Sequence, residues 1–142
     1  LAPLIAAERA AAAAPAWPRR AAALGAANAD WRLSKAETRR LAAIAAACEA
    51  AEPPAAAAYR HGADVARDAA LIYAAETRTT PSSDLETEID RGAAALFPLK
   101  ARDLIAAGAE PGPALGARLD RLREAWIASD FSADRATLLA EG

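Results

Sequence analysis

The chain has 142 residues, enough for one modest domain with a core of its own, and a formal net charge of −2. Hydrophobic residues make up 54% of it, but about a third of the chain is alanine, which buries little surface and favours helices. This balance excludes a uniformly basic nucleic-acid coat protein, and the single cysteine, Cys48, excludes an internal disulfide, as in a reducing cytoplasm.

Helices are the regular elements that the sequence predicts. Val65 is the only valine, and no stretch alternates apolar and polar residues as a strand does. No run approaches the ~20 strongly apolar residues of a membrane helix, and the start does not resemble a signal peptide. We expect an all-α cytoplasmic protein, an irregular bundle of about seven or eight short helices without membrane contact. Because the chain begins at Leu1 and has no methionine, we interpret it as a piece of a longer protein.

Prolines and glycines divide the first half into expected helices at residues 3–14, 18–28, 35–51, around Tyr59 up to Gly62, and 63–76. The sequence Ser34-Lys-Ala-Glu37 predicts a capping box, with Leu33 packing onto the helix that follows. The helix over 63–76 should turn Ile72 and Tyr73 toward the core. We also expect three tryptophans in the core rather than at a base-stacking surface, namely Trp17, Trp31 and Trp126.

The polar segment 77–83 is the expected linker, so we place a subdivision of the chain there. A helix starting at Asp84 should follow, and Ser132 should cap a last helix. The acidic residues Asp84, Glu86, Glu88 and Asp90 suit the start of a helix, where negative charge is favourable, better than a metal site.

Residues 97–126 carry the most distinctive pattern. Gly108 is expected to end a short helix that contains Leu104 and Ile105, because glycine tolerates a left-handed backbone. Pro111-Gly112-Pro113 then turns the chain into a helix that runs to about residue 128. Along that helix Leu115, Leu119, Leu122 and Trp126 form one apolar stripe.

This pattern resembles the C-terminal RNA-binding region of bacterial CCA-adding tRNA nucleotidyltransferases and the related poly(A) polymerases. The matching residues are Pro98, Leu99, Lys100, Asp103, Leu104, Gly108, Pro111, Gly112, Pro113, Gly116, Leu119 and Leu122. Leu33-Ser34-x-x-Glu37-x-x-Arg40-Leu41 and Trp126-Ile127-x-x-Asp130-Phe131 are weaker matches, and Ala101 stands where the family usually has glycine. The resemblance covers residues 33–139, and only the Pro-Gly-Pro block is specific.

The resemblance implies that all 142 residues form the helical C-terminal part of an enzyme that adds nucleotides to RNA 3′ ends with ATP, CTP and magnesium. Its partners would be tRNA and the enzyme's own N-terminal catalytic head. The Gly-Gly or Gly-Ser start and the Asp-x-Asp pair of that head do not occur here, so we expect no catalytic residue, metal site or cofactor in this piece. His61 is expected to interact with a helix C-terminus, and Cys48 to lie in the core.

Phosphates are bound by Arg and Lys side chains and by free N–H groups at helix N-termini. The RNA-binding candidates are therefore Lys100, Arg102, Gly112, Arg118 and Arg121, with a second group of Arg32, Lys35, Arg39 and Arg40. For each arginine the alternative is a solvated helix face. The turn glycines could equally allow two helices to cross closely. The alternative function is an all-α interaction or oligomerisation module whose contact face is the stripe from Leu115 to Trp126.

Overall fold

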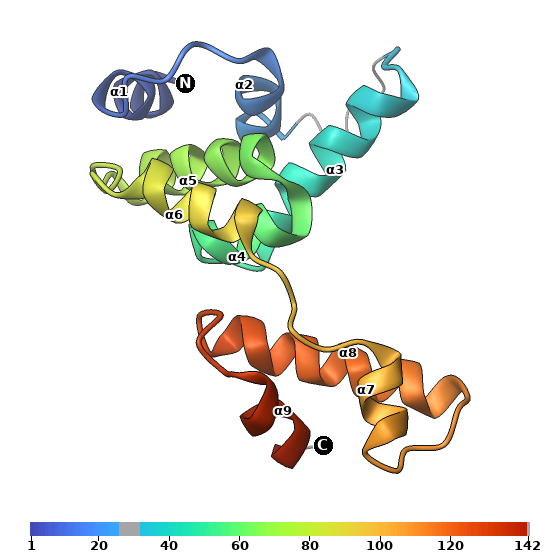
Figure 1. Cartoon of the computed structure of the whole chain (residues 1–142). Coiled ribbons are helices and arrows are strands. Elements are labelled where there is room, and N and C mark those ends of the chain that lie inside the picture. The colour runs from blue at the N-terminus through green and yellow to red at the C-terminus, as the bar shows by residue number, and fades with distance from the viewer. Residues whose placement is uncertain (26–31, 142) are drawn as a thin grey trace. The chain divides into compact units, whose positions relative to one another are not determined.

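The computed structural model describes residues 1–25 and 32–141, with side chains up to Ala140. Helices are the only regular elements in these ranges, which confirms the all-α prediction. The chain divides into two compact units, Leu1–Ala94 and Ala95–Gly142 (Figure 1). No helix in the described ranges is long and apolar enough to cross a membrane.

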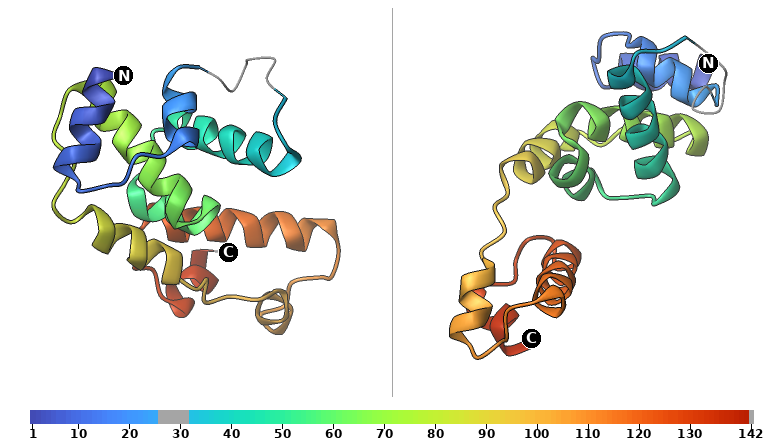
Figure 2. Two further views of the ribbon diagram at one scale, coloured as in Figure 1. Left: turned by 90° about the horizontal axis from the view of Figure 1, so that it is seen from above. Right: turned by 90° about the vertical axis from the view of Figure 1, so that its right-hand side faces the viewer.

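The first unit is built around α5 (Ala63–Thr77), which contacts every other helix of the unit. The helices that contact it are α1 (Ala2–Ala10), α2 (Trp17–Ala23), α3 (Lys35–Glu49), α4 (Pro54–His61) and α6 (Leu85–Ala94). In Figure 2 these helices surround α5. Ile44, Leu71 and Ile89 are fully buried at the centre of the core.

Two helices approach each other closely where α6 crosses α4. All four alanines from Ala55 to Ala58 are buried on α4, and Gly92 of α6 lies against the backbone of Ala55. A Cβ built at Gly92 would lie 1.9 Å from the carbonyl oxygen of Ala55. Small side chains therefore set the distance between these two helices.

The start of α3 has the predicted capping box. Ser34 Oγ accepts a hydrogen bond from the Glu37 N–H at 3.3 Å, and the Glu37 carboxylate accepts one from the Ser34 N–H at 2.7 Å. Leu33 packs against Leu41 and Ala21. Two orphan N–H groups of the helix are thus satisfied, and the chain before α3 is fixed against the core.

The second unit contains α7 (Ala101–Ala106), α8 (Pro113–Ala128) and α9 (Arg135–Glu141). Gly108 has φ +97° just after α7, as the left-handed helix end predicted for it requires. Pro113 occupies the first position of α8. The core of the unit includes Trp126, which is 4% exposed and lies 5.5 Å from Phe97 and 4.8 Å from Phe131, measured between ring centroids.

Several boundaries in the structure differ from those that the sequence predicted. The two compact units divide after Ala94, whereas a subdivision was expected near 77–83; Thr79–Ser82 lines pockets together with α1, α3 and α5 of the first unit. The first helix ends at Ala10 and not at residue 14. Two residues after its end, Ala12 has a positive φ of 51°, which is incompatible with a continued helix. The second helix, expected over 18–28, ends at Ala23 and is followed by a turn at Leu24 and Gly25, where Gly25 has a positive φ of 76°. Trp31 lies outside the described residues.

Three further residues differ from the prediction. Trp17 is 48% exposed at the start of α2, and Tyr73 is 56% exposed on α5, although both were expected in the core. The N-terminus of α9 is capped by Asp134, whose carboxylate accepts a hydrogen bond from the Thr137 N–H at 2.8 Å, and not by Ser132.

Candidate nucleic-acid interface

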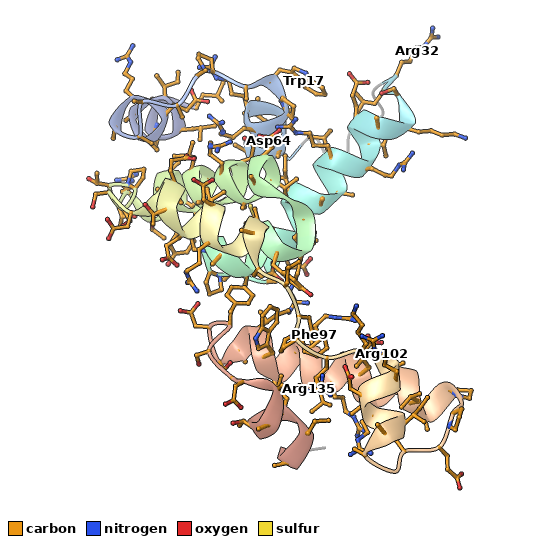
Figure 3. The ribbon with its side chains drawn as sticks, in the orientation of Figure 1. Trp17, Arg32, Asp64, Phe97, Arg102 and Arg135 are labelled. Atoms are coloured by element: carbon orange, nitrogen blue, oxygen red, sulfur yellow. The ribbon has the colours of Figure 1, made fainter. Side chains whose placement is uncertain are left out.

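Two of the candidate cations lie on α7. Lys100 immediately precedes the helix and Arg102 is in its first turn, and both side chains are exposed (Figure 3). The Asp103 carboxylate accepts a hydrogen bond from the Lys100 N–H at 2.7 Å. That bond, with the nearby charge of Arg135, holds the pKa of Asp103 below its usual 3.8, so Asp103 is an anion at neutral pH.

Two more candidates lie on α8, which packs against α7. Arg118 and Arg121 are three residues apart, so their side chains leave the helix on neighbouring parts of its surface. Arg121 is exposed. Arg118 is half-buried, and its Nε has no hydrogen-bond partner among the described residues. The Nε itself is shielded from solvent, so only the outer nitrogens of the Arg118 guanidinium could reach a phosphate.

The other two arginines of this unit are paired. Arg123 donates to Asp120 at 2.8 Å and lies 5.4 Å from the ring centroid of Phe97, while Arg135 binds Asp103 at 3.1 Å. Within the described residues Lys100, Arg102, Arg118 and Arg121 have no ion-pair partner. We call these four residues the α7–α8 cations.

The helix end at Gly112 was a candidate for phosphate contact or for close helix crossing. Gly112 is exposed with φ +154°, and a Cβ added at Gly112 or at Gly116 would meet no atom of the described chain within 4 Å. The interpretation that these glycines let two helices cross is therefore wrong within this structure. The close crossing lies at Gly92 instead.

The second candidate group lies at the start of α3, in the first unit. Arg32, Lys35 and Arg39 are exposed, and Figure 3 shows Arg32 extending from the end of the helix. The Arg39 Nε–H donates to the Lys35 carbonyl at 3.3 Å. Arg40 differs from them, because it binds Asp68 at 2.9 Å and reaches Asp64 at 4.0 Å. Its charge is already compensated within the unit, which makes it a poor phosphate ligand.

A buried ionic cluster explains the position of Arg40, and the sequence analysis missed it. Arg19 of α2 donates to Asp68 of α5 at 2.8 Å and to Glu8 of α1 at 2.9 Å, and these three residues are at most 3% exposed. Arg20 also donates to Glu8, at 2.8 Å. The cluster joins four helices, and nothing in the local sequence around Arg19 identifies it as buried.

Glu8 stays ionised in this cluster. Burial raises the pKa of its carboxyl, but the hydrogen bond and charge of Arg20, together with Arg19, outweigh burial and hold the pKa below its usual 4.5. The acidic side chains at the start of α6 are also paired, Glu86 with Arg67 at 2.6 Å and Glu88 with Arg91. Their negative charge is thus balanced by arginine.

No family model, curated protein or solved structure that was compared with this chain matches it. Among the described residues no group of three or more His, Cys, Asp and Glu side chains could hold a metal ion. His61 ends α4, and its Nε2 lies 3.5 Å from the Glu52 carboxylate, which Arg60 also binds at 2.9 Å.

Proposed function

We propose that this chain is the RNA-binding C-terminal part of a nucleotidyltransferase that adds nucleotides, as CCA or poly(A), to RNA 3′ ends, with tRNA as its partner. The observation that carries the proposal is the charge pairing in the second unit. Asp120 pairs with Arg123 and Asp103 pairs with Arg135, whereas the α7–α8 cations form no ion pair within the described part of the chain, on two helices that pack together. Unpaired cations on a rigid surface are what phosphate contacts require.

The pattern around Pro111-Gly112-Pro113 supports the same proposal through its resemblance to the family. In that view the chain binds the body of the RNA, and a separate head holds the magnesium ions and nucleotides. Binding of this kind positions one substrate against the other, which removes a large entropic part of the barrier in a two-substrate reaction. Arg32, Lys35 and Arg39 would add contacts from the first unit.

The alternative function, an interaction module, has lost its contact face. Leu115, Leu122 and Trp126 are buried and Leu119 is half-buried, and Trp126 packs against Phe97 and Phe131 of its own unit. A partner protein could use this stripe only if the unit opened.

The test is tRNA binding by fluorescence anisotropy at about 50 mM and about 200 mM salt, because phosphate contacts weaken steeply as salt rises. The variant Lys100→Gln with Arg121→Gln should bind more weakly, and the slope of log affinity against log salt should fall by about one per lost contact. Both side chains are exposed, so the fold should persist.

The matched control is Arg9→Gln with Arg78→Gln, which removes the same charge from exposed arginines that have no ion-pair partner in the described chain. Equal losses in the two variants would mean that net charge alone attracts RNA, and would contradict an α7–α8 interface. A third variant that replaces Arg32, Lys35 and Arg39 measures how much the first unit contributes to the affinity for tRNA. Absence of binding at the lower salt would refute the proposal for this chain.

A further inference from the structure

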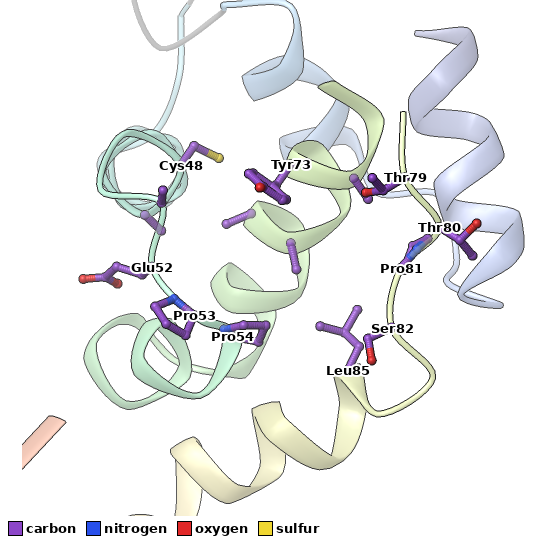
Figure 4. Close-up of a pocket in the computed structure, with 15 residues that line it drawn as sticks. Cys48, Glu52, Pro53, Pro54, Tyr73, Thr79, Thr80, Pro81, Ser82 and Leu85 are labelled. Atoms are coloured by element: carbon purple, nitrogen blue, oxygen red, sulfur yellow. The ribbon is translucent and has the colours of Figure 1, made fainter. Parts of the chain in front are cut away.

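A pocket of about 350 Å³ opens within the first unit, between α3, α5 and the segment before α6 (Figure 4). Its walls are mostly alanine and proline side chains. Leu85 closes one part of it, and Cys48, Tyr73 and Thr79 are arranged around it in Figure 4. The RNA-binding proposal does not use this pocket, and its volume is near the lower end of the ~300–1,000 Å³ usual for sites that hold one small molecule.

Tyr73 gives the pocket an aromatic surface. Its neighbours Leu71 and Ile72 on α5 are at most 3% exposed, whereas Tyr73 is 56% exposed beside the pocket. An aromatic ring left uncovered at a concave site offers a π-face on which a flat ring can stack.

The lining of the pocket has one charged group, the Glu52 carboxylate, whose charge Arg60 offsets. No lysine or arginine lines it, and its one carboxylate, Glu52, is bound by Arg60 and lies 3.5 Å from His61. Burial raises the pKa of the Cys48 thiol to about 11, so this group is uncharged at neutral pH. An occupant should therefore be uncharged as well, since an ion would lose its hydration without gaining a partner.

One side of the pocket is polar. Thr79, Thr80 and Ser82 line it, although in Figure 4 the Thr80 hydroxyl points away from Tyr73 and Cys48, so Thr79 and Ser82 are the hydroxyls available here. Thr79 Oγ1 lies 2.9 Å from Thr77 Oγ1, and Ser82 Oγ accepts a hydrogen bond from the Asp84 N–H at 3.2 Å. Because a hydroxyl has one donor and two acceptor positions, each retains capacity for a ligand.

We infer that this pocket binds an unpaired nucleobase from a single-stranded part of an RNA. A base is flat, uncharged and apolar on its faces, with hydrogen-bonding groups at its edge, and it would stack on Tyr73 with its edge toward the hydroxyls. The choice of RNA as the source of the base rests on the proposed function. The pocket itself is independent of the α7–α8 cations, which belong to the other unit.

Cys48 provides the test, because it is the only cysteine of the chain and it lines the pocket. The intact chain is labelled with a small maleimide near pH 9, with each of the four nucleosides added in turn. At least one nucleoside should slow the labelling in a saturable way, and ribose, which lacks the base, should not. Saturation-transfer NMR of the nucleoside provides a second readout that needs no reaction at Cys48.

Tyr73→Ala should raise the nucleoside concentration needed for half-maximal protection by roughly 5- to 150-fold. Tyr73→Phe, which keeps the ring, should retain binding. Ala70→Leu should fill the pocket and abolish protection, with helicity checked by circular dichroism. Nucleosides carry no phosphate, so a nucleoside should protect Cys48 equally well in the wild type and in the variant with Lys100→Gln and Arg121→Gln.

The inference is overturned if no nucleoside gives protection or saturation transfer, if ribose protects equally, or if benzyl alcohol protects as strongly as every nucleoside. Protection by a nucleoside in a chain that fails to bind tRNA would support the pocket while refuting the proposed function. tRNA binding without any nucleoside effect would support the proposed function while refuting the pocket.

Discussion

Gly92 of α6 lies directly against the backbone of Ala55 in α4, so closely that a Cβ at position 92 would be 1.9 Å from the Ala55 carbonyl oxygen. We predict that Gly92→Ala destabilises the first unit by about 3 kcal/mol, because backbone atoms on both sides must move apart. Thermal unfolding followed by circular dichroism measures the effect. Gly116→Ala is the control: it lies in a helix with open space around it and should gain about 0.5–1 kcal/mol. Similar melting temperatures for the two variants would contradict the close crossing.

Asp68→Ala should destabilise the protein strongly. The substitution leaves the buried Arg19 with one carboxylate, Glu8, and removing one partner from a buried pair typically costs ~3–5 kcal/mol. Asp120→Ala breaks a surface pair with Arg123 and should cost no more than about 1 kcal/mol. Urea unfolding midpoints compare the two, and a small effect at Asp68 would show that the cluster is not buried in solution.

Glu8 should make stability depend on pH in the acid range. Its folded pKa lies below the usual 4.5, so the folded state binds fewer protons than the unfolded state. The stabilisation is therefore complete above about pH 4.5 and disappears as the pH falls through the lowered pKa. Urea unfolding from neutral pH down to about pH 3 should show a steeper loss for the wild type than for Glu8→Gln. Parallel curves would exclude a contribution from Glu8.

Cys48 should react slowly in the folded protein. Burial, with the nearby charges of Glu76 and Asp68, raises the pKa of its thiol from 9.0 to about 11. Near pH 8 the folded chain should hold about 100-fold less thiolate than the unfolded chain, and thiolate is the reactive form. Alkylation with iodoacetamide should accelerate by about that factor in denaturing urea. Equal rates in both conditions would show an ordinary, accessible thiol.

Trp126 and Trp17 should differ in their importance for stability. Trp126→Ala removes a ring that is 4% exposed and contacts Phe97 and Phe131, and it should cost ~3–5 kcal/mol. Trp17→Ala removes a ring that is 48% exposed and should cost much less. Hydrogen exchange in the α8 amides resolves the effect in the second unit, and undiminished protection in the Trp126 variant would contradict its core position.

The sequence predicted what short-range patterns determine. The bounds of α5 and α8, the Ser34 capping box and the glycine end after α7 all depend on residues within about one helical turn of each other. It also predicted the burial of Trp126, because the stripe on α8 repeats over four positions.

The features that the sequence did not predict depend on distant residues. Arg19 pairs with Glu8 and Asp68, which lie 11 and 49 positions away, so no local spacing could mark it as buried. The same limit applied to the cations of the candidate site. Lys100 and Arg40 look equivalent in the sequence, and only the carboxylates of Asp64 and Asp68 beside Arg40 distinguish them.

The crossing of α4 and α6 also constrains how this protein can change over generations. Glycine is the smallest residue, so every substitution at Gly92 adds atoms at a place where the Ala55 backbone leaves no room for them. An ordinary core of leucine and isoleucine can drift in both directions, because a loss of volume at one position can offset a gain at another. At Gly92 the two helices already lie in direct contact. Any substitution there adds volume, so it can only push α4 and α6 apart.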